Sequence, residues 1–272
     1  MVRKITVVVP TLNSGKTLDW TLLSLVRQRN CQITVIIVDS GSSDDTSDIC
    51  DHWQVRMIYE PPGNMYRAIN AGLRLATTSW VTYLNSDDMV YPCTYARLID
   101  LGESTGSDVA YGSYDAVDSE GRFIYSYYPG YPDELRAQFL RSQLSFAQPA
   151  AIFTRQLFVD LNGFDVHYRL AADLDFFARS ALANRKFVML SGPTVAAFRV
   201  HRTQSSQDVT RIVAETRQIQ SMYGESYSVW SWPILRWRIR NWSQYLQRVL
   251  RHHAQYRQWR IVRTMDAEDE SA

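Results

Sequence analysis

The sequence predicts a doubly wound α/β domain with a mostly parallel sheet, followed by a C-terminal helical extension. Short β-branched runs alternate with helical patterns through the N-terminal half. Two of these runs are β-branched throughout, which is typical of strands buried on both faces of a parallel sheet. With 272 residues, 46% of them hydrophobic, the chain is long enough to bury a large core.

The first β-α-β unit is expected near the N-terminus. Residues 5–9 and 34–38 read ITVVV and TVIIV, and each predicts a buried strand. Between them, residues 18–26 carry leucines at helical spacing, with Asn13 or Ser14 as the expected cap. This order predicts a parallel strand pair joined by a helical crossover.

The alternation continues, then loosens after residue 105. Helices are expected at 46–52, 66–76 and 173–182, and strands at 56–59, 80–84, 109–111, 123–127, 151–153 and 195–200. One helix is thus expected between residues 105 and 205. Residues 204–208 form a linker candidate before a helical pattern that begins near residue 210. We therefore divide the chain into a domain at 1–205 and an extension at 206–272.

The composition argues against several classes of protein. The formal net charge of +1 gives no general reason to expect nucleic acid as a partner. Three cysteines without a CxxC pair argue against both a disulfide framework and a zinc site. The apolar run after residue 4 is too short for a signal peptide, and no run of about 18 apolar residues follows. We expect a cytoplasmic protein that does not span a membrane.

Three polar segments follow predicted strands, at the edge where doubly wound sheets bind ligands. They are residues 10–13 (PTLN), 39–46 (DSGSSDDT) and 85–88 (NSDD). Asp39, held rigidly at a strand end, can accept hydrogen bonds from a base or ribose. The alternative is an ordinary turn in which Asp44 caps the next helix.

Asp87 and Asp88 place two adjacent carboxylates at the same edge. Mg²⁺ and Mn²⁺ bind one or two carboxylates together with phosphate oxygens, so this pair suits a nucleoside diphosphate. Adjacent acids also repel each other unless a cation or hydrogen bonds compensate. The alternative is helix capping ahead of Tyr91-Pro92.

Together these segments resemble those of the family 2 glycosyltransferases, in order and spacing. The resemblance covers about residues 5–205. It is carried by VVPTLN (8–13), VDSGSSDDT (38–46), YRAINAG (66–72), LNSDD (84–88), VAYG (109–112), GFD (163–165) and DLD (173–175). It implies a Rossmann-like GT-A fold, with residues 1–105 as the nucleotide-sugar-binding half and 106–205 as the half with the acceptor site and catalytic base.

The resemblance also implies roles for single residues. The nucleotide sugar would be bound by Pro10, Thr11, Asn13, Asp39, Arg67, Asn70, Ser86 and Asp87. Asp88 would bind a Mn²⁺ or Mg²⁺ cofactor, and Asp173 would be the catalytic base. His201 is either a second metal ligand or a hydrogen-bonding residue at the surface. Gln148 lies in a stretch similar to the family's acceptor region.

Two positions depart from the family pattern. The position of Arg67 is often an aspartate in the family, so Arg67 either neutralises phosphate charge or serves packing. Ala172 stands where a glutamate commonly precedes the base. Independently of the family, a carboxylate such as Asp173 suits removal of the proton from an attacking hydroxyl. The alternative is that Asp173 is the N-cap of the helix that follows.

The C-terminal extension mixes tryptophan with arginine. Residues 230–264 contain no Asp or Glu, and their arginines are Arg236, Arg238, Arg240, Arg248, Arg251, Arg257, Arg260 and Arg263. Such a helix suits an anionic membrane surface, an interface in a homo-oligomer, or packing on the catalytic domain. No nucleic-acid recognition motif accompanies the charge.

We therefore expect a metal-dependent, inverting glycosyltransferase. It would transfer a sugar from a nucleoside diphosphate sugar to a hydroxyl of a glycan or lipid-linked acceptor in surface polysaccharide synthesis. The resemblance implies uracil as the base of this donor. The first alternative is a catalytically silent scaffold that binds nucleotide sugars. A nucleotidyltransferase is disfavoured because the chain has no glycine-rich basic loop for a triphosphate, and a dehydrogenase because no GxGxxG follows the first strand.

Overall fold

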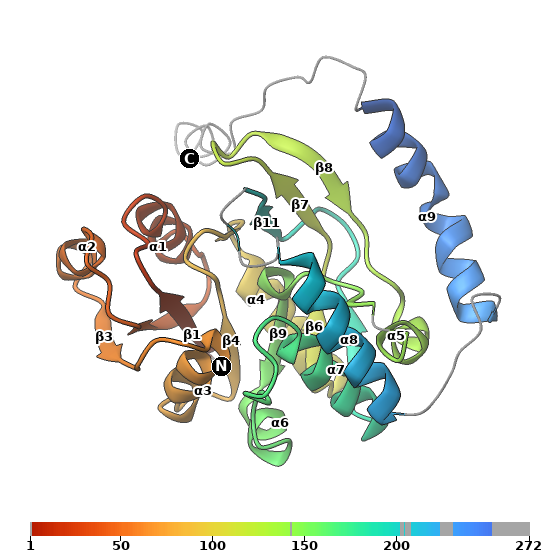
Figure 1. The fold of residues 1–272 in the computed structure, drawn as a ribbon, viewed down its shortest axis with the longest axis horizontal. Helices are drawn as coiled ribbons and strands as arrows, with labels where there is room; N and C mark the ends of the chain where they lie inside the picture. Colours follow the sequence, from red (N-terminus) through yellow and green to blue (C-terminus); the bar gives the residue numbers. More distant parts are fainter. Residues whose placement is uncertain (1, 142, 202–203, 205–207, 224–230, 252–272) are drawn as a thin grey trace.

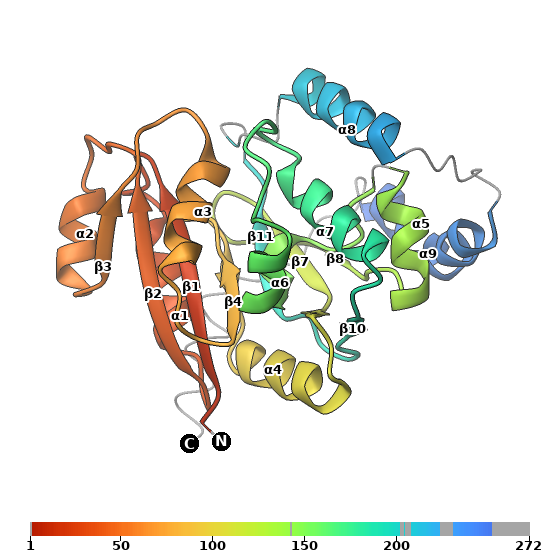
Figure 2. The ribbon, with the colours of Figure 1, turned by 90° about the horizontal axis from the view of Figure 1, so that it is seen from below.

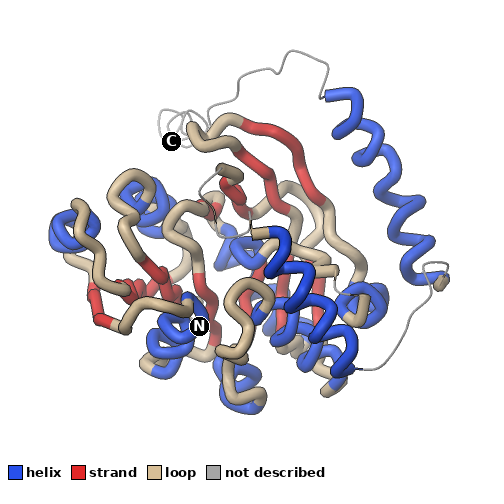
Figure 3. The backbone as a smooth tube through the Cα atoms, viewed as in Figure 1, coloured by secondary structure: helices blue, strands red, loops and turns tan. Residues whose placement is uncertain are grey.

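The computed structural model describes residues 2–141, 143–201, 204, 208–223 and 231–251, with the backbone alone for 243–251. Its strands form two sheets, and helices cover both faces of the larger one (Figure 1; Figure 3). This arrangement confirms the predicted α/β fold with a mostly parallel sheet and a C-terminal helix.

The larger sheet has seven strands in the order β10-β6-β9-β4-β1-β2-β3. They are β1 (Lys4–Thr11), β2 (Gln32–Asp39), β3 (Arg56–Tyr59), β4 (Trp80–Tyr83), β6 (Val109–Tyr111), β9 (Ala151–Thr154) and β10 (Phe187–Met189). Paired strands run parallel except β9, which is antiparallel to both β4 and β6. Seven of the eight residues of β1 are buried, as its apolar sequence predicts for a strand covered on both faces.

Two layers of helices enclose this sheet. One face packs against α1 (Leu18–Val26), α2 (Thr46–His52) and α4 (Thr94–Thr105). The other packs against α3 (Met65–Arg74), α5 (Pro132–Phe139), α6 (Arg155–Asp160) and α7 (Ala172–Leu182). Val7 and Val8 belong to the cores on opposite faces, because successive side chains of a strand point to opposite sides. At Gly72 of α3, an added Cβ would lie 2.6 Å from a methyl carbon of Val8, so this helix lies very close to β1.

The smaller sheet has the order β5-β11-β7-β8. Its strands are β5 (Met89–Val90), β11 (Ala196–Arg199), β7 (Tyr114–Val117) and β8 (Phe123–Tyr127). β5 directly follows the NSDD segment, and β11 pairs with it in antiparallel fashion. The smaller sheet therefore brings residues near 88 beside residues near 199.

Two helices follow the sheets, α8 (Val209–Tyr223) and α9 (Trp232–Arg251). α9 lies beside α5 and β8 (Figure 1). Arg236 Nε and Arg240 Nη2 lie 2.7 and 2.9 Å from the two carboxylate oxygens of Glu134, which is completely buried. The Arg240 guanidinium also lies 3.8 Å from the centre of the Tyr131 ring. Packing of α9 on α5 thus accounts for two of the arginines.

The other side of α9 is exposed. Trp232, Ile239 and Trp242 keep 67%, 60% and 62% of their surface accessible. Among the described residues, no helix combines the length and the apolar character that crossing a bilayer requires. Large apolar side chains on one exposed helix face commonly mark a contact surface.

The structure corrects several expected local features. The N-cap of α1 is Thr17, whereas Asn13 has a left-handed backbone (φ 54°) and bonds to Ser43 instead. Between residues 105 and 205 three α-helices occur, because the short α5 and α6 precede α7. Helices of eight and six residues give too few turns for a clear periodic pattern. Most of the expected linker at 204–208 lies outside the described residues.

Candidate active site

Three loops at the carboxyl ends of β1, β2 and β4 are joined by side-chain hydrogen bonds. We call residues 10–15, 40–46 and 84–88 the edge loops. Asn13 Oδ1 accepts from the backbone N–H of Ser43 at 2.9 Å, and the hydroxyl oxygens of Ser14 and Ser86 lie 2.7 Å apart. Pro10 is buried at the end of β1. The structure thus brings the three polar segments of the sequence together.

Asp39 ends β2 and is 9% exposed. Its Oδ1 accepts from the hydroxyls of Thr11 and Ser42, and its Oδ2 accepts from the N–H groups of Gly41 and Ser42 at 2.9 Å. Burial alone would raise the pKa of Asp39, but these hydrogen bonds outweigh it and hold the pKa below its ordinary value. A base or ribose could bind this carboxylate by replacing the Ser42 hydroxyl, which can rotate away.

Arg67 and Asn70 lie on α3 and both contact neighbouring protein groups. Arg67 Nε lies 2.7 Å from Glu60 Oε1, and its guanidinium donates to the Pro61 carbonyl at 2.8 Å. Asn70 is buried, donates to the Phe164 carbonyl at 2.8 Å and accepts from the Phe164 N–H at 3.0 Å. Asn70 therefore joins α3 to the loop ahead of α7, and its contact with a nucleotide sugar stays a prediction.

Asp87, in the edge loop at 84–88, forms a close pair with His201. His201 Nε2 lies 2.7 Å from Asp87 Oδ2, and the two side chains are 22% and 18% exposed. Within the part of the chain that the structure describes, no three His, Cys, Asp or Glu side chains converge as a cation site. A Mg²⁺ or Mn²⁺ ion on this pair would therefore need further oxygen ligands, and diphosphate and water are the usual ones.

Asp88 points into the protein and is completely buried. Its Oδ1 accepts from the Arg199 N–H at 2.9 Å, and its Oδ2 accepts from the Asn85 amide at 3.2 Å. Burial and the neighbouring charge of Asp87 raise the pKa of Asp88 well above its ordinary value. Each oxygen of Asp88 thus accepts one hydrogen bond from the protein, and the role of Asp88 as a metal ligand stays a prediction.

Arg199 was not singled out from the sequence, yet it organises this part of the site. It is 4% exposed, and its guanidinium donates to the carbonyls of Asp87 at 2.8 Å and Ser119 at 2.7 Å. Together with its backbone bond to Asp88, these contacts fix the NSDD segment against β11. An arginine near the end of a strand carries no sequence signal that distinguishes such a buried role from a surface one.

Asp173 lies in the first turn of α7, whose N-cap residue is Ala171. The alternative role of Asp173, as the N-cap of this helix, is therefore wrong by two positions, although its Oδ1 accepts from the N–H of the next residue at 2.8 Å. Burial raises the pKa of Asp173 to about 6, and hydrogen bonds from the Leu174 N–H and the Tyr66 hydroxyl only partly oppose that rise. A carboxyl with this pKa is ionised at neutral pH and is still basic enough to accept a proton.

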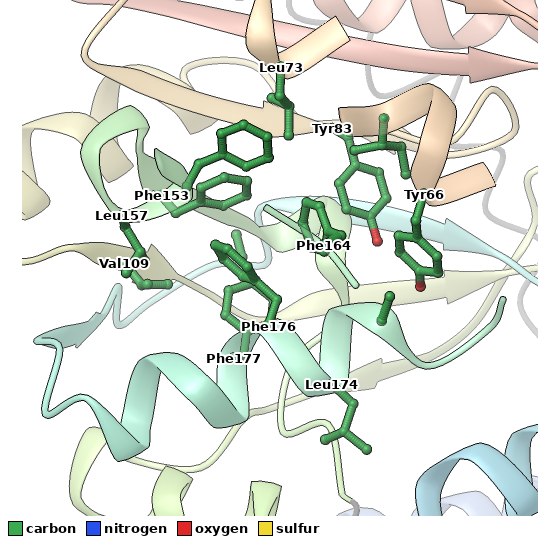
Figure 4. Packing of buried hydrophobic residues seen from close by; sticks show 14 of the residues in the cluster. Tyr66, Leu73, Tyr83, Val109, Phe153, Leu157, Phe164, Leu174, Phe176 and Phe177 are labelled. Carbon is green, nitrogen blue, oxygen red and sulfur yellow. The ribbon is translucent and has the colours of Figure 1, made fainter. Parts of the chain in front are cut away.

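Two buried tyrosines lie between α3, β4 and α7. The rings of Tyr66 and Tyr83 meet edge to face at 6.3 Å, and both contact Phe164. Figure 4 shows their hydroxyl groups pointing toward the helix that carries Leu174 and Phe176. Burial raises the pKa of Tyr83 well above its ordinary value, and the charges of Asp173 and Asp88 add to this. These two hydroxyls thus stay protonated beside Asp173.

Gln148 is the remaining residue singled out for the acceptor side. It is 4% exposed, and its amide donates to the Thr82 hydroxyl at 2.9 Å. Thr82 in turn donates to the Ala151 carbonyl. Gln148 thus binds β4 through Thr82, and its contact with an acceptor stays a prediction.

Comparisons with known proteins agree with the fold and the motifs. The model of the family described as Glycosyl transferase family 2 matches residues 6–161. The chain is 32% identical over 191 residues to a PGL/p-HBAD biosynthesis glycosyltransferase of Mycobacterium bovis, covering 66% of this chain and 72% of the relative.

Solved structures share the fold at lower identity. The 1-349 fragment of TarS from S. aureus, in complex with UDP-GlcNAc, has a TM-score of 0.62 and 20% identity over 90% of this chain and 79% of that one. This chain spans 44% of the longer TarS chain. A mannosyltransferase from Pyrobaculum calidifontis, in complex with GDP-Man and Mn²⁺, has a TM-score of 0.61 and 18% identity, covering 85% and 68%. The match of the family model over more than half of the sequence shows that the chain belongs to glycosyl transferase family 2.

Proposed function

We propose that this protein is an inverting glycosyltransferase that uses a nucleoside diphosphate sugar and Asp173 as its base. Asp173 takes the proton of an acceptor hydroxyl while that oxygen attacks the anomeric carbon. The bond from this carbon to the diphosphate breaks in the same step, and the nucleoside diphosphate leaves. A single displacement of this kind needs one base and charge stabilisation on the leaving group.

The observation that carries this proposal is the partly buried carboxyl of Asp173 at the start of α7. Its pKa of about 6 separates it from Asp39, whose pKa is held below its ordinary value by hydrogen bonds. Carboxylates whose environments drive their pKa values apart commonly have different tasks in an active site. We assign proton transfer to Asp173 and donor recognition to the edge loops with Asp39.

We further propose that the cation side of the site is built on Asp87 and His201, with Asp88 supporting them. Asp87 and His201 are partly exposed and already adjacent, and carboxylate with imidazole is a donor set that Mn²⁺ accepts. Asp88 is completely buried, and both its oxygens accept hydrogen bonds. When bound, a divalent cation would stabilise the charge on the leaving diphosphate.

We propose that Arg67 binds the diphosphate when the donor is present. Its guanidinium is exposed enough to exchange Glu60 for a phosphate group, since exposed ion pairs contribute little stability. Asn70 joins α3 to the loop ahead of α7, and we propose that it acts there by positioning. The base of the donor is proposed to be uracil, with TarS bound to UDP-GlcNAc as the structural precedent.

We also propose that the protein works at the cytoplasmic face of the plasma membrane, on a glycan or lipid-linked acceptor for surface polysaccharide. The exposed Trp232, Ile239 and Trp242 of α9 form a surface that suits the interfacial region of a bilayer. Arg236 and Arg240 form ion pairs with Glu134. The proposal of membrane contact therefore depends more on these apolar side chains than on the charge of the arginines. A homo-oligomer through the same face is the alternative.

The test is a donor screen that measures nucleotide release by the purified protein, with and without EDTA. We expect release with one class of nucleoside diphosphate sugar, loss of release with EDTA, and loss in Asp173→Asn. A silent scaffold would instead bind the donor without releasing nucleotide under any condition. EDTA-insensitive release that survives Asp173→Asn would overturn the mechanism.

A further inference from the structure

α8 contacts the rest of the protein through a narrow stripe with a carboxylate near its middle. Ile212, Glu215, Ile219 and Tyr223 recur at helical spacing and face inward, while most other residues of the helix are exposed. Ile219 is completely buried in the core beside α7, and Glu215 is 9% exposed. α8 lies beside α7 in both views of the ribbon (Figure 1; Figure 2).

Glu215 accepts hydrogen bonds from three consecutive backbone N–H groups. Its Oε1 accepts from Arg169 at 3.0 Å, and its Oε2 accepts from Leu170 at 2.9 Å and Ala171 at 3.0 Å. Ala171 is also the N-cap residue of α7, and its methyl side chain cannot accept a hydrogen bond. A carboxylate from another helix therefore binds the backbone of the segment that leads into α7, up to and including its N-cap residue.

A second contact from α8 fixes α7 further along. The Tyr223 hydroxyl donates to Asp175 Oδ1, and Asp175 Oδ2 accepts from Arg179 Nε at 2.8 Å. Arg179 in turn donates to the carbonyls of Leu161 and Gly163 at 2.6 and 2.9 Å. Asp173 lies between the segment bound by Glu215 and the residue bound by Tyr223, so α8 restrains the backbone on both sides of it.

Helix attachment alone does not explain a carboxylate at this position. An isoleucine or leucine there would hold α8 by apolar burial, whereas a buried carboxylate loses its hydration and needs several hydrogen bonds in return. Three convergent N–H groups provide them and fix the loop in one geometry. Unlike an apolar side chain, the carboxylate thus fixes the backbone conformation of residues 169–171.

We propose that Glu215 is a positioning residue for Asp173: it holds the loop at 169–171 so that the carboxyl of Asp173 meets the acceptor hydroxyl. This inference rests on the proposed function, since it assumes that Asp173 is the base. Catalysis of proton transfer depends on sub-ångström placement, and a shift of about 1 Å in a reacting group commonly costs about a hundredfold in rate.

Glu215→Gln is the direct test, because glutamine keeps the shape but offers one acceptor oxygen instead of two. At least one of the three N–H groups then loses its partner. We expect kcat to fall about tenfold or more while KM for the donor sugar stays within about twofold. We also expect the acidic limb of the pH profile of kcat/KM to move to lower pH, because burial and the charge of Glu215 both raise the pKa of Asp173 and the variant removes that charge.

Two further variants keep the test decisive. Arg217→Gln changes the charge of the exposed face of α8 by one unit and should leave both the rate and the pH profile unchanged. Tyr223→Phe removes the contact with Asp175 and should lower kcat with no movement of KM for the donor, even if Glu215→Gln does not fold. Unchanged kcat in folded Glu215→Gln or in Tyr223→Phe would overturn the inference.

The same assay separates this inference from the proposed function. If Asp173→Asn retains full activity, the assignment of the base fails and the positioning role fails with it. If Asp173→Asn is inactive while Glu215→Gln matches the wild type in kcat and pH profile, the positioning role alone is wrong.

Discussion

Replacing Asp173 by asparagine should stabilise the ligand-free protein. Its pKa is about 6 in the folded protein against an ordinary value of 3.8. At about 1.4 kcal/mol for each tenfold change in proton affinity, the charged carboxyl would cost the folded state about 3 kcal/mol at pH 8. Because the side chain keeps some contact with solvent, we expect Asp173→Asn to gain about 2 kcal/mol.

The stability gained by Asp173→Asn should decrease as the pH falls. As the pH falls through 6, folded wild-type protein takes up the proton before the unfolded chain does, so its free energy of unfolding rises relative to the variant. Below about pH 4 the carboxyl is neutral in both states, and the advantage of Asp173→Asn should vanish. Urea unfolding of both proteins at pH 8, 6 and 4 measures this difference.

Asp175→Asn is the matched control on the same helix. Asp175 is 2% exposed and is paired with Arg179 and Tyr223, so loss of its charge should destabilise the protein by about 2 kcal/mol at pH 8. If Asp173→Asn raises the free energy of unfolding and Asp175→Asn lowers it, burial of an incompletely paired charge at Asp173 is supported. Destabilisation by Asp173→Asn at pH 8 would refute it.

Three further perturbations test other parts of the structure. Asp87→Asn should weaken Mn²⁺ binding in the presence of nucleoside diphosphate at least about tenfold by calorimetry, and equal binding by this variant would contradict the assigned cation side. Gly72→Ala should lower the free energy of unfolding by about 1–3 kcal/mol, because the new methyl group overlaps Val8; an unchanged urea midpoint would count against the close packing of α3 on β1. Replacing Trp232 and Trp242 by alanine should reduce sedimentation with anionic vesicles on the order of tenfold, and undiminished binding would remove α9 from the membrane proposal.

The sequence was most informative where one physical requirement dominates. The runs around Val8 and Ile36 are apolar on both faces, which is what a central parallel strand needs, and they form β1 and β2. The meeting of the edge loops could also be predicted, because parallel strands end at a common edge of the sheet. Their polar side chains do meet, as the contacts of Asn13 and Ser14 show.

The sequence was least informative where neighbours distant in the chain decide the outcome. Asp87 and Asp88 are identical as residues, and only the pairing of β5 with β11 turns one toward His201 and the other toward the Arg199 backbone. Glu215 looks like any acidic residue of a surface helix until the loop at 169–171 is placed against it. No local pattern records such contacts.

Single-turnover kinetics test most directly whether Asp173 is the base of a single-displacement sugar transfer. With donor and acceptor saturating, we expect the wild-type transfer rate to fall on the acidic side with an apparent pKa near 6. Asp173→Asn should bind the donor with unchanged affinity and transfer sugar about a hundredfold to ten-thousandfold more slowly at neutral pH. A variant that transfers sugar at the wild-type rate, with the same acidic limb, would contradict the account.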